Sequence, residues 1–241
     1  TMTKTAMIVW GGWLGHEPEQ IAHVFGDLLE NEGFAVEIYD SLDVCEDEDR
    51  MQSLHLFIPV VTMSKITDDQ CRGVSEAVAN GTGLAGCHGG MCDAFRESVL
   101  WEFMTGGTWV AHPGGDGVEY EVNIRQSSSP LVHGIQDFMM CSEQYYLHVD
   151  PSVEVLATTR FPTVNWYHSA NGHVDVPVVW TKRWGVGRVF YNSVGHHADI
   201  FDIPEALELM RRGFLWAAEG KDIALREGLD SSPYRTDAKM F

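Results

Sequence analysis

Histidines are the residues of this sequence whose positions suggest chemistry most directly. The chain has 11 of them, and imidazole is the side chain most often used for proton transfer near neutral pH and for metal ligation. His16, His88 and His196 each follow a segment that is typical of a strand, and Glu143 lies in a polar loop. A carboxylate near imidazoles can orient a histidine or take a proton. We therefore predict His16, His88, Glu143 and His196 as catalytic residues.

Four further residues are predicted to contact a substrate. Three are aromatic neighbours of the predicted catalytic residues, and the fourth is a histidine in a loop that precedes a predicted strand. Flat aromatic faces stack on sugar rings, although most aromatic side chains of a globular protein belong to its core. The predicted contacts are Trp13, His112, Tyr145 and Tyr146.

The segment Ala85-Gly-Cys-His-Gly-Gly90 predicts a sharp turn between a strand and a helix, which forces one side chain into the open. In one register His88 stands at the apex. In a second register Cys87 stands there, and the following helix N-terminus would favour a nucleophilic thiolate. A third interpretation is a purely structural turn with Cys87 buried at the end of the strand.

A metal ion is a further option for these residues. Three imidazoles and Glu143 would satisfy a tetrahedral zinc site, or an octahedral manganese site with water. No two of them have a short ligand spacing such as HExxH, so the sequence leaves open whether zinc, manganese or no cofactor is bound.

The elements that must position these residues alternate between strand and helix. Residues 5–10 form an apolar run typical of a strand buried on both faces, followed by a helix from Pro18 to the stop at Gly33. Thr67 and Gln70 form a capping-box pattern at the start of another helix. We also expect a helix over 94–103 and a last one that Asp202–Glu205 caps. The predicted strands are 5–10, 34–39, 54–61, 82–87, 118–126, 153–159, 176–182 and 188–192.

This order of elements predicts a three-layer α/β fold with a doubly wound, mostly parallel sheet. Ligands of such sheets bind outside the carboxyl ends of the strands, where the predicted catalytic histidines lie. We expect one domain over residues 1–221 and a C-terminal tail over residues 222–241.

Composition limits the classes of partner. With 16 Lys and Arg against 35 Asp and Glu, the formal charge is −19, which argues against nucleic acids and anionic membranes. No apolar run is long enough to span a bilayer, and we see no signal peptide. Five scattered cysteines are interpreted as reduced thiols of a cytoplasmic protein. The oligomeric state is left open, a homodimer being one option.

Several segments together resemble the ThuA-like (trehalose utilisation) family over residues 3 to 220. The most specific is residues 177–191 with Gly195 and His196. The others are Gly11 to His16, Gly86 to His88, Ala111 to Pro113, Ser129 to Ile135, and Ser142-Glu143 with Tyr145 and Tyr146. The resemblance implies the class I glutamine amidotransferase-like (flavodoxin-like) fold, with a histidine at the elbow where that superfamily usually has a cysteine. This matches His88, whereas Cys87 and Gln144 depart from the family pattern.

The resemblance also implies a small carbohydrate substrate from trehalose or disaccharide utilisation, such as a 3-keto-glycoside. A base, His88 or Glu143, would form an enediolate, which His16, His196 or a metal would stabilise while His112 contacts the sugar. Isomerisation, or elimination or hydrolysis of the glycosidic substituent, could follow. Two alternatives stay open: a cysteine hydrolase or amidotransferase-like enzyme with Cys87 as nucleophile, and a non-catalytic sugar-binding or regulatory module.

Overall fold

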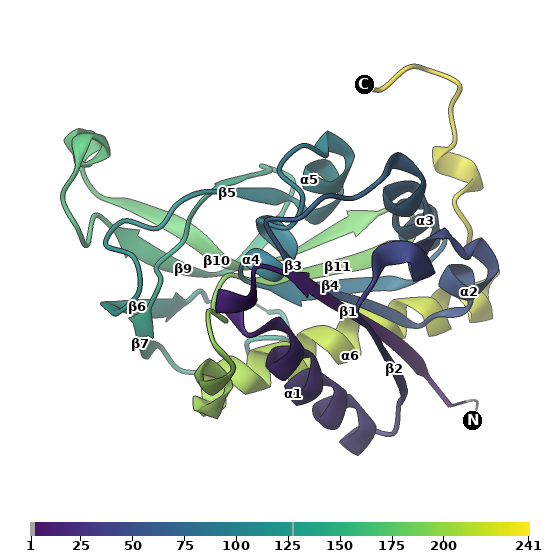
Figure 1. The fold of residues 1–241 in the computed structure, drawn as a ribbon, viewed down its shortest axis with the longest axis horizontal. Helices are drawn as coiled ribbons and strands as arrows, with labels where there is room; N and C mark the ends of the chain where they lie inside the picture. Colours follow the sequence, from purple (N-terminus) through teal and green to yellow (C-terminus); the bar gives the residue numbers. More distant parts are fainter. Residues whose placement is uncertain (1–2, 127) are drawn as a thin grey trace.

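The computed structural model describes residues 3–126 and 128–241. Its centre is a nine-stranded sheet with the order β2-β1-β3-β4-β11-β10-β9-β6-β7, covered by helices on both faces (Figure 1). Five neighbouring strands are parallel: β2 (Ala35–Tyr39), β1 (Thr5–Gly12), β3 (Leu56–Thr62), β4 (Gly83–Cys87) and β11 (Gly187–Asn192). The sheet continues with antiparallel pairing through β10 (Val174–Trp184), β9 (Glu154–Phe161), β6 (Val118–Ile124) and β7 (Phe138–Ser142). The expected α/β fold is confirmed, and its sheet is mixed.

Two apolar clusters, one on each face of the sheet, form the core. Successive residues of a strand point to opposite faces, so Ala6 and Ile8 belong to one cluster while Met7 and Val9 belong to the other. Helices α1 (Pro18–Asn31) and α6 (Pro204–Glu227) pack on the first face. Helices α2 (Glu48–Ser53), α3 (Asp68–Ala79) and α5 (Val99–Thr105) pack on the second. The apolar run at residues 5–10 is therefore buried on both sides, as predicted.

The helix expected over 94–103 is divided in the structure. Helix α4 (Gly89–Cys92) starts directly after β4, and α5 begins only after Ser98, whose side chain caps it. Between them the backbone carbonyls of Asp93 and Ala94 accept hydrogen bonds from the loop that follows β3. These long-range bonds replace the helical ones, so the helical pattern is broken where the chain is tied to a neighbouring strand.

Three strands were not predicted: β7, β5 (Gly107–Ala111) and β8 (Tyr146–Val149). β5 and β8 form a separate two-stranded sheet. The sequence of β7, Phe-Met-Met-Cys-Ser, alternates between buried and exposed positions but contains no β-branched residue. Its alternation is therefore visible only once its partner strand is known.

The C-terminal end of the chain also differs from expectation. Helix α6 continues to Glu227, so the expected boundary after residue 221 falls inside a helix. A short 3-10 turn, η5 (Ser232–Tyr234), follows. The other 3-10 turns are η1 (Leu14–His16), η2 (Leu42–Glu46), η3 (Tyr167–Asn171) and η4 (Ala198–Asp202). Within residues 3–126 and 128–241, no helix combines the length and apolarity that crossing a membrane requires.

Candidate functional site

Three imidazoles and one carboxylate from distant parts of the chain meet at one point. His16, His88 and His196 follow β1, β4 and β11, and Glu143 directly follows β7. All four side chains are buried, and one ligand atom from each lies within 4.8 Å of those of the others. We call these four residues the histidine–glutamate cluster. It consists of the four residues that the sequence predicts as catalytic.

Glu143 Oε2 is the centre of the cluster. It lies 3.1 Å from His88 Nε2, 3.1 Å from His196 Nδ1 and 3.8 Å from His16 Nε2. Burial by itself would raise the pKa of Glu143, but its close polar contacts with the three histidines outweigh burial and lower the pKa well below its usual range. The carboxyl group is therefore ionised at neutral pH, in a setting where an unpaired carboxylate would be costly.

His88 stands at the apex of the turn between β4 and α4. Its φ of 51° is rare for a residue with a side chain. The strained backbone is held by hydrogen bonds from its N–H to the Asn192 carbonyl (2.8 Å) and from the Tyr191 hydroxyl to its carbonyl (2.9 Å). Its ring donates from Nδ1 to the Ser193 carbonyl at 2.8 Å. Burial lowers the pKa of His88 to about 4, so this imidazole is neutral near pH 7.

Cys87 occupies the last position of β4 and belongs to the core. Its side chain is 3% exposed and packs against Gly195, where an added Cβ would lie 2.8 Å from the sulfur. Burial raises the pKa of the thiol, which disfavours the thiolate that a nucleophile requires. Of the two registers considered for the elbow, the structure has the one with His88 at the apex, and the Cys87 nucleophile is not supported.

His16 is fixed by contacts with β3 and α4. Its Nδ1 lies 2.9 Å from the Thr62 hydroxyl. A Cβ added at Gly89 would lie 2.8 Å from His16 Cε1 and 2.7 Å from Thr62 Cγ2. The first residue of α4 must therefore be a glycine for the His16 ring to reach the cluster.

Glu143 and its neighbours are tied to the antiparallel half of the sheet. The Tyr120 hydroxyl donates to the Glu143 carbonyl at 3.0 Å. The side-chain amide of Gln144 donates to the Thr159 hydroxyl (2.8 Å) and the Arg160 carbonyl (3.1 Å). Gln144, which departs from the family pattern, thus anchors the carboxylate-bearing segment to β9.

The rim of the cluster contains groups that solvent reaches. The His112 side chain is 39% exposed, with Nδ1 3.5 Å from Glu143 Oε1. Asp116 lies 3.7 Å from His196 Nε2 and is about half exposed. Trp13, 46% exposed, packs edge-on against His16. These residues can contact a molecule bound over the cluster.

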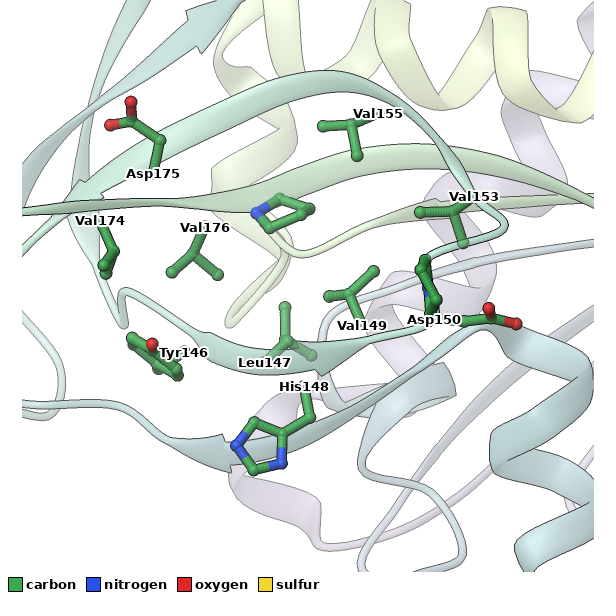
Figure 2. Close-up of a pocket in the computed structure, with 12 residues that line it drawn as sticks. Tyr146, Leu147, His148, Val149, Asp150, Val153, Val155, Val174, Asp175 and Val176 are labelled. Atoms are coloured by element: carbon green, nitrogen blue, oxygen red, sulfur yellow. The ribbon is translucent and has the colours of Figure 1, made fainter.

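The two predicted tyrosine contacts have different positions. Tyr145 is buried and stacks on the His88 ring at 3.8 Å, so it orients the imidazole. Tyr146 instead packs against Phe161 and His168. It lines an open hollow of about 510 Å³ between β8 and the strands β9 and β10 (Figure 2). The structure therefore does not bring Tyr146 to the cluster, because neighbouring residues of an extended segment point in opposite directions.

Some residues of the site were missed by sequence reasoning. Thr62, Tyr120 and Tyr191 act through contacts that only the folded sheet creates. Asp116 could have been noticed, because it lies in the glycine-rich loop that starts at His112.

Comparisons with known proteins agree with this architecture. Residues 5–217 match the ThuA family model, described as trehalose utilisation. A ThuA-like protein from Bacteroides uniformis has a TM-score of 0.70 at 17% identity, covering 89% of this chain and 91% of that one. A ThuA-like protein from Parabacteroides merdae has a TM-score of 0.68 at 20% identity, covering 91% of each chain. A β-galactosidase from Bacillus circulans sp. alkalophilus has a TM-score of 0.58 at 14% identity, covering 95% of this chain and 32% of that one. No curated protein matches the sequence.

Proposed function

Because this chain belongs to the ThuA family of trehalose utilisation, we propose that it is an enzyme of carbohydrate utilisation that acts on a keto-sugar or 3-keto-glycoside by acid–base chemistry. The observation that carries the proposal is the convergence of His16, His88 and His196 on the Glu143 carboxylate. The family supports a role in carbohydrate utilisation, and the cluster supports acid–base chemistry.

A 3-keto group makes the neighbouring C–H bonds acidic. When a base removes that proton, the electron pair moves onto the keto oxygen and forms an enediolate, whose negative oxygen needs stabilisation. Return of the proton to a different carbon isomerises the sugar. Alternatively, the electron pair moves back and expels the glycosidic oxygen from the next carbon, and an acid protonates that oxygen as it leaves.

The exposure of each residue suggests its role. His112 is the most accessible imidazole near Glu143, which makes it the best candidate for moving protons to and from the sugar. The buried histidines His16 and His196 are better placed to stabilise the enediolate oxygen. His88 has Nδ1 on the Ser193 carbonyl and Nε2 facing Glu143, so we assign it to holding the Glu143 carboxylate in place rather than to the role of base that the sequence suggested as an option.

The proposal is tested by incubating the protein with 3-keto-trehalose or 3-keto-glucose and following the sugar by NMR. We expect turnover by the wild type and its loss in a folded His88→Ala variant, while His23→Ala, an exposed position of α1, leaves turnover unchanged. Binding of the keto-sugar without any conversion would show a sugar-binding module instead. Equal turnover in His88→Ala would remove the cluster from the mechanism.

A further inference from the structure

We propose that the histidine–glutamate cluster binds one divalent transition-metal ion. The inference deepens the proposed function, on which it depends for the ion's chemical role but not for the binding itself. Three imidazoles and a carboxylate are donors that first-row divalent metals accept, and here they come from four separate segments of the chain.

Two of the three donor distances from Glu143 Oε2 match those of ligands around one ion, and the third is longer. Two donors that each lie about 2.1 Å from a metal are about 3.0 Å apart at a right angle and about 3.4 Å apart at the tetrahedral angle. The distances from Glu143 Oε2 to the nitrogens of His88, His196 and His16 are 3.1, 3.1 and 3.8 Å. Small side-chain rotations would complete the coordination.

The hydrogen bonds of His88 indicate that a cation can lie between its Nε2 and Glu143. The Ser193 carbonyl can only accept, so Nδ1 of His88 carries the hydrogen in their 2.8 Å contact. In the neutral ring, Nε2 then carries a lone pair that points toward Glu143 Oε2, 3.1 Å away. This carboxylate oxygen also carries only lone pairs. Two acceptors at this distance repel each other unless a proton or a metal ion lies between them.

A metal ion accounts for the other histidines better than a proton does. Proton bridges would need a separate N–H from each of the three nitrogens that converge on this oxygen, whereas one ion can be shared by all three. Within the described part of the chain, His196 Nδ1 is buried and has no hydrogen-bond partner, although it faces the cluster. One ion would be coordinated by all three imidazoles at once.

The outward nitrogens of the three rings complete the pattern. Ligand histidines usually direct their second nitrogen to an oxygen that fixes the orientation of the ring. His88 has the Ser193 carbonyl, His16 the Thr62 hydroxyl at 2.9 Å, and the third ring has the Asp116 carboxylate 3.7 Å from its Nε2. Two of the three rings are thus oriented by an oxygen within hydrogen-bond distance, and the third has a carboxylate nearby.

The ion would have a defined role in the proposed reaction. In a five- or six-coordinate shell, four protein ligands leave a position for the keto oxygen, where a divalent ion stabilises developing negative charge. The cluster residues would then be ligands, leaving His112 on the rim for proton transfer. The substrate class this implies is a sugar with a carbonyl oxygen.

The test measures metal binding without any sugar. Protein stripped with a chelator is dialysed against Zn²⁺ or Mn²⁺, and bound metal is quantified by mass spectrometry. A Cys141→Ser background removes the exposed thiol. We expect about one ion per chain in this background, and at least tenfold weaker binding in Glu143→Gln and in His16→Gln. His23→Gln is the matched control and should bind like the background protein.

A second readout covers variants that fold poorly. Co²⁺ bound to the background protein should give visible absorption bands typical of nitrogen and oxygen coordination. These bands should disappear when Zn²⁺ displaces the Co²⁺. The metal site would be overturned if the background protein took up no more Zn²⁺ or Mn²⁺ than the Glu143→Gln variant and gave no Co²⁺ absorption bands. Metal binding without conversion of keto-sugars would contradict the enzyme proposal alone, and conversion by fully metal-free protein would contradict the metal role alone.

Discussion

At the scale of single residues, burial decides which side chains can react. The Cys87 thiol and the His88 imidazole are consecutive and both buried, yet only His88 points at polar partners. Cys87 lies among the apolar residues of the first core cluster. A strand-to-helix turn exposes one residue to the site, and the residue before it remains part of the sheet.

The burial of Cys87 predicts that its thiol reacts differently from the exposed thiol of Cys141. In the folded protein iodoacetamide should label the exposed Cys141 and leave Cys87 unmodified, because burial disfavours its thiolate. Cys87→Ala should keep keto-sugar turnover while lowering the free energy of unfolding by about 0.5–3 kcal/mol. Peptide mass spectrometry and urea unfolding measure the two effects. Rapid labelling of Cys87 coupled to loss of turnover would restore the thiol mechanism.

A second residue-scale prediction concerns the hydroxyl that orients His16. Thr62→Val keeps the shape of the β3 residue but removes the partner of Nδ1. We expect an affinity for Zn²⁺ that is about 10–100-fold weaker, the usual effect of losing such a partner, with the fold retained. Competition with a chromophoric chelator measures it, and Thr163→Val at an exposed position is the control. Unchanged affinity in Thr62→Val would mean that His16 is not a ligand.

At the scale of elements, the turn between β4 and α4 carries strain that serves the site. A side chain at φ 51° costs about 1–3 kcal/mol relative to glycine. The turn is nevertheless held in place by bonds from β11, through Asn192 and Tyr191. The sheet therefore stabilises a conformation that the local sequence would not adopt alone.

The strain can be measured by comparing two variants at position 88. We expect His88→Gly to be more stable than His88→Ala by about 1 kcal/mol or more, because only glycine relaxes at this φ. At Glu76, an exposed site within α3, the same pair should show the opposite order. Urea unfolding of the four variants gives the result. An alanine variant as stable as the glycine variant at position 88 would show that the turn is not strained.

Element boundaries explain which site residues were predictable. His16, His88 and His196 could be predicted because a histidine within a few residues of the end of a buried strand falls at the carboxyl edge of a parallel sheet. Thr62 could not, since its role depends on β3 lying beside β1. The predicted substrate contact Tyr146 lies away from the cluster, because the sequence does not show which way each residue of an extended segment points.

At the scale of the whole molecule, the sheet gathers the site from two differently built halves. The parallel half was predictable from its apolar runs, and it supplies the three histidines. The antiparallel half contains Met-rich β7, whose weak pattern hid it, and it positions Glu143 through Tyr120 and Gln144. The expected helix over 94–103 failed for a related reason, since long-range bonds to the loop after β3 divide it.

The account requires the gathered residues to act as one unit, and a double-variant comparison tests this most directly. The measurement is kcat/KM toward the converted keto-sugar for His88→Gln, His196→Gln and the double variant, with folding verified by circular dichroism. Because both rings serve the same Glu143 oxygen, each single change should cost about 10²–10⁴-fold and the double variant should be about as slow as either single one. Losses that multiply, or single variants with full activity, would contradict a shared site.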